Sequence, residues 1–206
     1  MTTISREPWA PQQATPPATP GFDVDVLVIG SGPAGGAMAL ALATYGVNVL
    51  AITKYGRLAD TPRAHITNQR AVEVMRDLGI EDQLLREATP WGHMTNTTYC
   101  TSLAGQELGR IHSWGTSPTR HADYELASPC GMVDAPQTIV EPLLMRNAQA
   151  RGAKVRFDTE YISHTQDFDG VTTTVKDRLT GATYDIRARY LVGADVVGRA
   201  GEAVLD

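Results

Sequence analysis

The chain has 206 residues, of which 42% are hydrophobic, and this is enough apolar material to form one buried core. Its formal net charge is −5 and it has no basic patch interleaved with aromatic residues, so neither nucleic acid nor a membrane is an expected partner. Cys100 and Cys130 lie far apart and outside any CxxC spacing, and we see neither a secretory segment nor an apolar run long enough to span a bilayer. We therefore expect two reduced thiols in a cytoplasmic protein, while the sequence alone leaves a bridge between them open.

The first part of the chain predicts a tail followed by a βαβ unit. Residues 1–22 are rich in Pro, Thr, Gln and Ala and predict a disordered tail, so the folded domain is expected over residues 23–206. A short apolar run, "DVDVLVI", predicts a buried parallel strand. The turn "GSGPAGG" and a helix of small and apolar residues closed by Gly46 follow, and then a second buried strand, "VNVLAIT". Such a unit requires a parallel, right-handed crossover.

The middle of the chain is less regular. After the polar segment "TPRAHITNQR", a helical face of Ala71, Met75 and Leu78 stops at Gly79. The segments "TNTTYCTSL" and "GRIHSW" predict strands, and "GTSPTRHADYELASP" is typical of a loop. From Gln137 onward the pattern predicts a helix. Pro142 is tolerated in this helix only if it lies in about the first turn.

The last part predicts a three-stranded β-meander, which makes the fold class α/β. Its expected strands are separated by the turn signals "DFDG" and "LTG" and read "VRFDTEYISHTQ", "GVTTTVKD" and "ATYDIRARYLVGAD".

A glycine motif between the first strand and the first helix indicates a phosphate site. Gly30, Gly32 and Gly35 form GxGxxG, and Pro33 and Ala34 open the helix that follows. These glycines suit a tight turn, close approach to a pyrophosphate and close helix packing, and the helix N-terminus offers N–H groups to phosphate. The alternative is a set of packing glycines in an unrelated turn.

The acid that usually accompanies this motif is missing. It is expected about 20 residues on, at the end of the second strand, where it binds a ribose hydroxyl. Thr53 occupies that place here and is followed by Lys54. A threonine hydroxyl can still form a hydrogen bond with a ribose hydroxyl, but a weaker one than a carboxylate forms. The spacing does not distinguish FAD from NAD(P).

Several motifs together resemble the single-component (class A) FAD-dependent aromatic hydroxylases, in particular the phenol hydroxylase branch. They run from Asp23 to Asp195, and the most specific is "TPRAHITNQRAVEVMRDLGIED", followed by "TSLAGQELGRI", "PQTIVEPLL", "GAKVRFDTEYISH" and "YLVGAD". The resemblance implies a Rossmann-like, glutathione-reductase-like FAD-binding domain, incomplete in this chain. It also implies FAD as cofactor, NAD(P)H as co-substrate, O2 as oxidant and a phenol as substrate, and it leaves open a homo-oligomer in the full-length form.

The resemblance assigns roles to four residues beyond the glycine loop. Arg63 matches an arginine that reaches the FAD diphosphate and ribose region, and its fixed charge and forked donors suit that role. Gln137 matches a glutamine that bonds to the flavin, and Asp195 belongs to the second FAD signature. The alternative role for Arg63 is a surface ion pair, and the alternative for Gln137 is a helix position that faces solvent. His65 matches the position beside the substrate hydroxyl.

His65 is the expected catalytic base. A phenol has a pKa of about 10, so roughly one molecule in a thousand is ionised at neutral pH, and the phenolate is the electron-rich form that reacts. A histidine with its ordinary pKa of about 6.5 can take that proton at working pH. The alternative is a loop histidine bonded only to backbone. The other histidines have no ligand spacing, so no metal site is expected.

Two departures from the family pattern lead to a rival hypothesis. "YLVGAD" continues as "VVGRAGEAVLD", with Val196 where glycine is expected, and the returning GD motif and most of the substrate domain of the family have no counterpart. We therefore expect a truncated or frameshifted product or a deliberate fragment, which makes a catalytically inert nucleotide-binding module a rival to the enzyme. An NAD(P)-dependent dehydrogenase is a further rival, but it does not explain "RAHITNQR".

Overall fold

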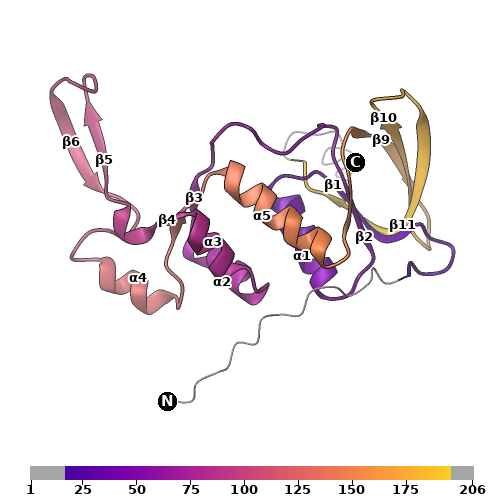
Figure 1. Ribbon diagram of the computed structural model, residues 1–206, viewed down its shortest axis with the longest axis horizontal. Helices are drawn as coiled ribbons and strands as arrows, with labels where there is room; N and C mark the ends of the chain where they lie inside the picture. The colour runs from indigo at the N-terminus through magenta and orange to yellow at the C-terminus, as the bar shows by residue number, and fades with distance from the viewer. Residues whose placement is uncertain (1–16, 196–206) are drawn as a thin grey trace, which may run out of the picture. The chain divides into compact units, whose positions relative to one another are not determined.

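The computed structural model describes residues 17–195 and divides into two compact units (Figure 1). The first unit comprises Met1–Asp60 and Glu141–Asp206, and the second comprises Thr61–Val140. Most of the expected tail and the altered segment that begins at Val196 lie outside the described residues.

The first unit contains a six-stranded sheet with the strand order β8-β2-β1-β11-β10-β9. The parallel neighbours are β8 with β2, β2 with β1 and β1 with β11, while β9, β10 and β11 form an antiparallel meander. The predicted βαβ unit and meander are therefore confirmed. The strands are β1 (Val24–Ile29), β2 (Val49–Ile52), β8 (Lys154–Arg156), β9 (Thr159–Gln166), β10 (Val171–Asp177) and β11 (Thr183–Gly193).

The first expected meander strand is in fact two strands. β8 pairs with β2 and β9 pairs with β10, and Asp158 separates them with a φ of 51°. A residue in the left-handed region interrupts an extended strand. Aspartate can adopt this conformation, so no glycine marks the break in the sequence.

Helix α1 (Pro33–Thr44) packs through small residues. Its buried positions include Gly35, Gly36, Ala39 and Leu40, which lie on one face. A Cβ built on Gly36 would lie 3.1 Å from the Leu144 Cβ of helix α5 (Gln137–Ala150), so the two helices are in close contact. Both faces of β1 are buried, which explains its continuous apolar sequence.

Pro142 lies inside α5, beyond the first turn, where the sequence did not favour it. Proline there removes one N–H from the helix ladder, at a cost of roughly 3 kcal/mol. Leu143 and Leu144 follow it and are almost completely buried. Burial of two leucines stabilises by roughly 3–6 kcal/mol, so packing outweighs the lost hydrogen bond.

The turn between β9 and β10 depends on one carboxylate. Asp167 Oδ1 accepts from Arg187 Nη2 at 2.7 Å, from Asp169 N at 2.9 Å and from Gly170 N at 3.0 Å. The guanidinium of Arg187, and then the two backbone N–H groups, lower the pKa of Asp167 from 3.8 to about 2. A depressed pKa means that the ionised group stabilises the fold above pH 3.8 and that this contribution is lost between pH 3.8 and pH 2.

We expect Asp167→Asn to lower the melting temperature at pH 6 and to lower it much less at pH 2, because about half of the wild-type carboxylate is itself protonated at pH 2. Circular dichroism melts from pH 7 to pH 2 measure this difference. Asp169→Asn, two residues along the same turn, is the matched control and should leave the melting temperature unchanged across the range. A loss in Asp167→Asn that is equal at pH 6 and pH 2 would contradict the assignment.

The second unit contains three complete α-helices, one short 3-10 helix and two small sheets. Its three-stranded sheet has the order β3-β7-β4, and β5 and β6 form a hairpin. The Asn68 side chain caps α2 by accepting from Ala71 N at 2.9 Å, and Gly79 ends the helix region with a φ of 68°. The elements are β3 (Ile66–Thr67), α2 (Gln69–Asp77), α3 (Glu81–Glu87), β4 (Thr89–Pro90), η1 (Trp91–His93), β5 (Asn96–Cys100), β6 (Glu107–His112), α4 (His121–Ala127) and β7 (Val133–Asp134).

The prediction of a loop through "GTSPTRHADYELASP" was wrong, because this segment contains α4. None of the residues of α4 is buried, so the helix has no apolar face for a sequence pattern to reveal. The predicted strands of the β5–β6 hairpin are confirmed.

Within residues 17–195, no helix has the length and apolar content needed to cross a bilayer. Both cysteines are free thiols, with Cys100 exposed and Cys130 buried.

Candidate functional site

The glycine loop follows β1 and turns into α1. Gly30 has a φ of 112°, and a Cβ on it would lie 2.8 Å from Ala194 O, so the turn requires glycine. A Cβ on Gly35 would lie 2.1 Å from Gly30 O, which leaves no space for any side chain. A Cβ on Gly32, by contrast, would meet its nearest atom at 3.8 Å. Contacts within the chain therefore require glycine at the first and third positions of the motif. They do not require it at the second, where the absence of a side chain lets a ligand approach the backbone.

The N-terminus of α1 is open to an anion. Gly32 is the N-cap residue and makes no side-chain cap, and Pro33 and Ala34 form the first turn. First-turn N–H groups have no partner within a helix, and the helix dipole adds positive potential there. This end of the helix can therefore hold a phosphate group.

Asp195 lies next to the glycine loop. β11 leads to it, Ala194 N donates to Ile29 O at 2.8 Å, and the N of Asp195 lies 3.2 Å from a Cβ built on Gly30. Within the described part of the chain, Asp195 Oδ1 is buried and has no hydrogen-bond partner. A buried carboxylate oxygen needs a donor, and a ligand hydroxyl can supply one. The loop, the helix end and this oxygen together fit a dinucleotide such as FAD.

Thr53 and Glu141 are two further buried polar residues of the first unit. Thr53 is 5% exposed, and its hydroxyl accepts from Tyr55 N at 3.4 Å. Glu141 is 4% exposed, its Oε2 accepts from Ala59 N at 2.7 Å, and its Oε1 is the atom nearest to the position of a Gly32 Cβ. Sequence reasoning missed Glu141, because a single acid in a helix gives no signal.

The second unit holds the other predicted residues around one short backbone ladder. Ala135 N donates to His65 O at 2.6 Å, and Gln137 N donates to Arg63 O at 3.0 Å. Ala64, between Arg63 and His65, has a φ of 47°, an uncommon conformation for a residue with a side chain. Strained backbone of this kind is often found at functional sites.

His65 is paired with a carboxylate. Its Nδ1 lies 3.0 Å from Asp134 Oδ2, and the side chains are 56% and 33% exposed. A carboxylate only accepts, so Nδ1 carries the proton and Nε2 is left as the basic nitrogen. The sequence did not reveal Asp134, because no local spacing connects residues so far apart in the chain.

The predicted site residues thus fall into two sets. Gly30, Gly32, Pro33, Ala34, Gly35, Thr53 and Asp195 belong to the first unit, and Arg63, His65 and Gln137 belong to the second.

The sequence profile described as "FAD binding domain" matches residues 23–202. The chain belongs to this FAD binding domain family.

Relatives of this FAD binding domain include two enzymes. It is 55% identical over 181 residues to phenol 2-monooxygenase of Pseudomonas sp. (strain EST1001), covering 88% of this chain and 30% of the relative. It is 57% identical over 174 residues to 2,4-dichlorophenol 6-monooxygenase of Delftia acidovorans, covering 84% of this chain and 30% of the relative. The chain therefore spans about a third of the length of these relatives.

The fold is similar to that of solved flavin-dependent monooxygenases. The FAD binding domain is similar to the flavin-dependent monooxygenase PieE in complex with FAD and substrate, with a TM-score of 0.85 and 42% identity over 90% of this chain and 32% of that one. It is also similar to aklavinone-11 hydroxylase with FAD and aklavinone, with a TM-score of 0.76 and 32% identity over 86% of this chain and 34% of that one. The predicted α/β FAD-binding fold is confirmed.

Proposed function

We propose that this chain is the FAD-binding, N-terminal portion of a flavin-dependent monooxygenase that ortho-hydroxylates phenols with NAD(P)H and O2. The observation that carries the proposal is the His65–Asp134 pair, which gives a domain of this family a base suited to a phenol. Identity above 50% to two phenol-type monooxygenases supports the substrate class. The two free cysteines support the cytoplasm as the compartment.

The role of His65 follows from its pair with Asp134. Nε2 accepts the phenol proton while Asp134 holds Nδ1–H and stabilises the imidazolium that forms. The resulting phenolate is electron-rich at its ortho carbon. When bound, FAD supplies the transfer of reducing equivalents from NAD(P)H to O2 and of one oxygen atom to the ring. Overall, phenol, O2, NAD(P)H and a proton give catechol, NAD(P)+ and water.

The remaining predicted residues are proposed to hold FAD. The N-terminus of α1, from Gly32 to Gly35, binds the pyrophosphate, and Asp195 Oδ1 accepts from a hydroxyl of the cofactor. For Arg63 and Gln137, a role toward FAD is proposed on the family resemblance alone. Thr53 is proposed at the ribose through its hydroxyl, although its burial leaves it little room.

We expect FAD to bind the 206-residue chain and Gly32→Ala to weaken that binding by roughly tenfold or more, because a methyl group intrudes where the pyrophosphate approaches. The fold should be unaffected, since the new Cβ meets no atom closer than 3.8 Å. Flavin fluorescence and calorimetry measure the affinity, and a thermal melt checks the fold. Gly109→Ala, which faces open space, is the matched control and should bind FAD as the wild type does.

Tighter binding of NAD+ than of FAD in the same titration would contradict the proposal and favour a dehydrogenase.

A nucleotide-binding module without turnover is the second candidate, favoured by the observation that the chain spans only about 30% of its relatives. The two candidates differ in one measurement. Phenol-dependent NAD(P)H consumption with stoichiometric catechol by the chain itself supports the enzyme, and FAD binding with consumption at background supports the module.

A further inference from the structure

The strand that carries Asp134 is very short. β7 has two residues, and it pairs with two residues of β3 and two of β4. A ladder of this length gives little stability by itself. The position of the Asp134 carboxylate therefore depends on how the chain is held just before β7.

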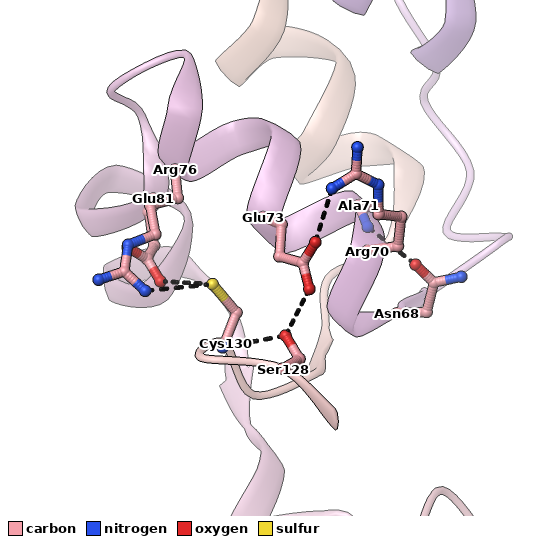
Figure 2. Close-up of polar contacts among 8 residues, drawn as sticks. All are labelled: Asn68, Arg70, Ala71, Glu73, Arg76, Glu81, Ser128 and Cys130. Atoms are coloured by element: carbon pink, nitrogen blue, oxygen red, sulfur yellow. Dashed lines mark hydrogen bonds and ion pairs between the residues drawn. The ribbon is translucent and has the colours of Figure 1, made fainter. Parts of the chain in front are cut away.

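Ser128 attaches that preceding segment to helix α2 (Figure 2). Its Oγ donates to Glu73 Oε1 at 2.7 Å and accepts from Cys130 N at 3.1 Å. Arg70 Nη1 holds the other oxygen of Glu73 at 2.6 Å. The hydrogen bond from Ser128, and then that from Arg70, lower the pKa of Glu73, so the acceptor is ionised at neutral pH.

Cys130 makes a second attachment, to the end of α2 and the start of α3. Its thiol donates to Glu81 Oε1 at 3.4 Å and accepts from Arg76 Nη1 at 3.7 Å, as Figure 2 shows. The residue is 3% exposed, and burial raises the pKa of the thiol, so it keeps the proton that it donates. Gln69 Nε2 also donates to Cys130 O, at 2.9 Å.

The same helix also fixes the chain that carries His65. β3 follows His65 directly and leads through the N-cap Asn68 into α2. Helix α2 therefore supports both partners of the pair. It positions His65 through β3, and it positions the segment before Asp134 through Glu73.

We infer that Glu73, Ser128 and Cys130 are positioning residues that set the Asp134 carboxylate against His65 Nδ1. Without these attachments, β7 can shift along β3, and the carboxylate no longer selects the tautomer in which Nε2 is the base. The geometry of the pair stands on its own, and only its catalytic meaning rests on the proposed function.

The tautomer of His65 reports this positioning directly. In the 206-residue chain labelled with 15N-histidine, at about pH 8.5, the 15N spectrum gives the ratio of Nδ1–H to Nε2–H forms, and His65→Gln assigns the signal. Asp134→Asn should lower the ratio by roughly tenfold, the effect of losing a charge-assisted hydrogen bond. Ser128→Ala should lower it by roughly threefold, because the segment is loosened while the carboxylate remains.

Matched variants separate positioning from general damage. Ser113→Ala removes a hydroxyl that bonds to Thr97 Oγ1 at 2.6 Å in the same unit, and it should leave the ratio unchanged. Ser128→Thr keeps the hydroxyl and should restore the wild-type ratio. Cys130→Ala tests the second attachment in the same way and serves if Ser128→Ala does not fold.

An unchanged ratio in folded Ser128→Ala or Cys130→Ala overturns the inference, and so does a wild-type His65 that lacks the Nδ1–H form. The measurement needs neither FAD nor a phenol. If a full-length protein fails to hydroxylate phenols while the ratio responds as expected, the proposed function fails and the positioning role stands.

Discussion

Gly35→Ala is expected to destabilise the first unit of the FAD binding domain strongly. A Cβ at this position would lie 2.1 Å from Gly30 O and 2.8 Å from Gly30 C, and both are backbone atoms of the tight turn. Real Cβ atoms essentially never approach so closely, so β1 and α1 must separate. Overpacking in a rigid core typically costs 1–3 kcal/mol, and a backbone clash at the central βα junction should exceed about 3 kcal/mol. Urea unfolding followed by circular dichroism measures the loss.

Gly36→Ala is the matched control for this experiment. Its Cβ would meet side-chain atoms of Leu144 at 3.1 to 3.8 Å, and a side chain can move by a few tenths of an ångström. The higher helix propensity of alanine, worth up to about 1 kcal/mol, offsets part of the remaining cost. Equal unfolding midpoints for the Gly35 and Gly36 variants would show that the close approach at Gly30 is not rigid.

His65→Ala should slow phenol hydroxylation by roughly 10²- to 10³-fold near pH 6.5, in a full-length monooxygenase that contains this segment. This is the usual contribution of a positioned general base. The loss should shrink as the pH rises toward 10, because solvent then ionises the phenol without help. Product formation measured from pH 6 to pH 10 tests the dependence.

Two controls accompany the His65 experiment. The FAD content should be unchanged, because the substitution leaves the glycine loop intact. Asp134→Asn should lower the rate in the same direction but by less, since Nε2 is still present and only its tautomer is disturbed. A parallel loss of rate at every pH would exclude His65 as the base.

The elements that the sequence predicted well are those with local signals. The βαβ unit and the meander follow from apolar runs and from turn chemistry such as the Asp167 turn, and the steric needs of Gly30 and Gly35 explain the glycine loop. Helix α4 was missed because none of its residues is buried.

The part of the site that could not be predicted depends on contacts between distant segments. β3 and β7 have two residues each, too few for any alternation to be read from sequence. Asp134 becomes significant only when β7 brings it beside His65, and Glu141 only when α5 brings it beside the glycine loop. Such pairings are set by tertiary structure, which a single sequence does not display.

The parallel pairing of β1 with β11 sets the order of events during synthesis. Val24 pairs with Ala188, so one edge of β1 stays without its partner until nearly the whole domain has left the ribosome. At 5–20 residues per second, this takes roughly ten to thirty seconds. During that interval an apolar strand edge is exposed to other nascent chains, and the glycine loop, which contacts Ala194, is incomplete. The nucleotide site is therefore expected to be the last part of the first unit to form.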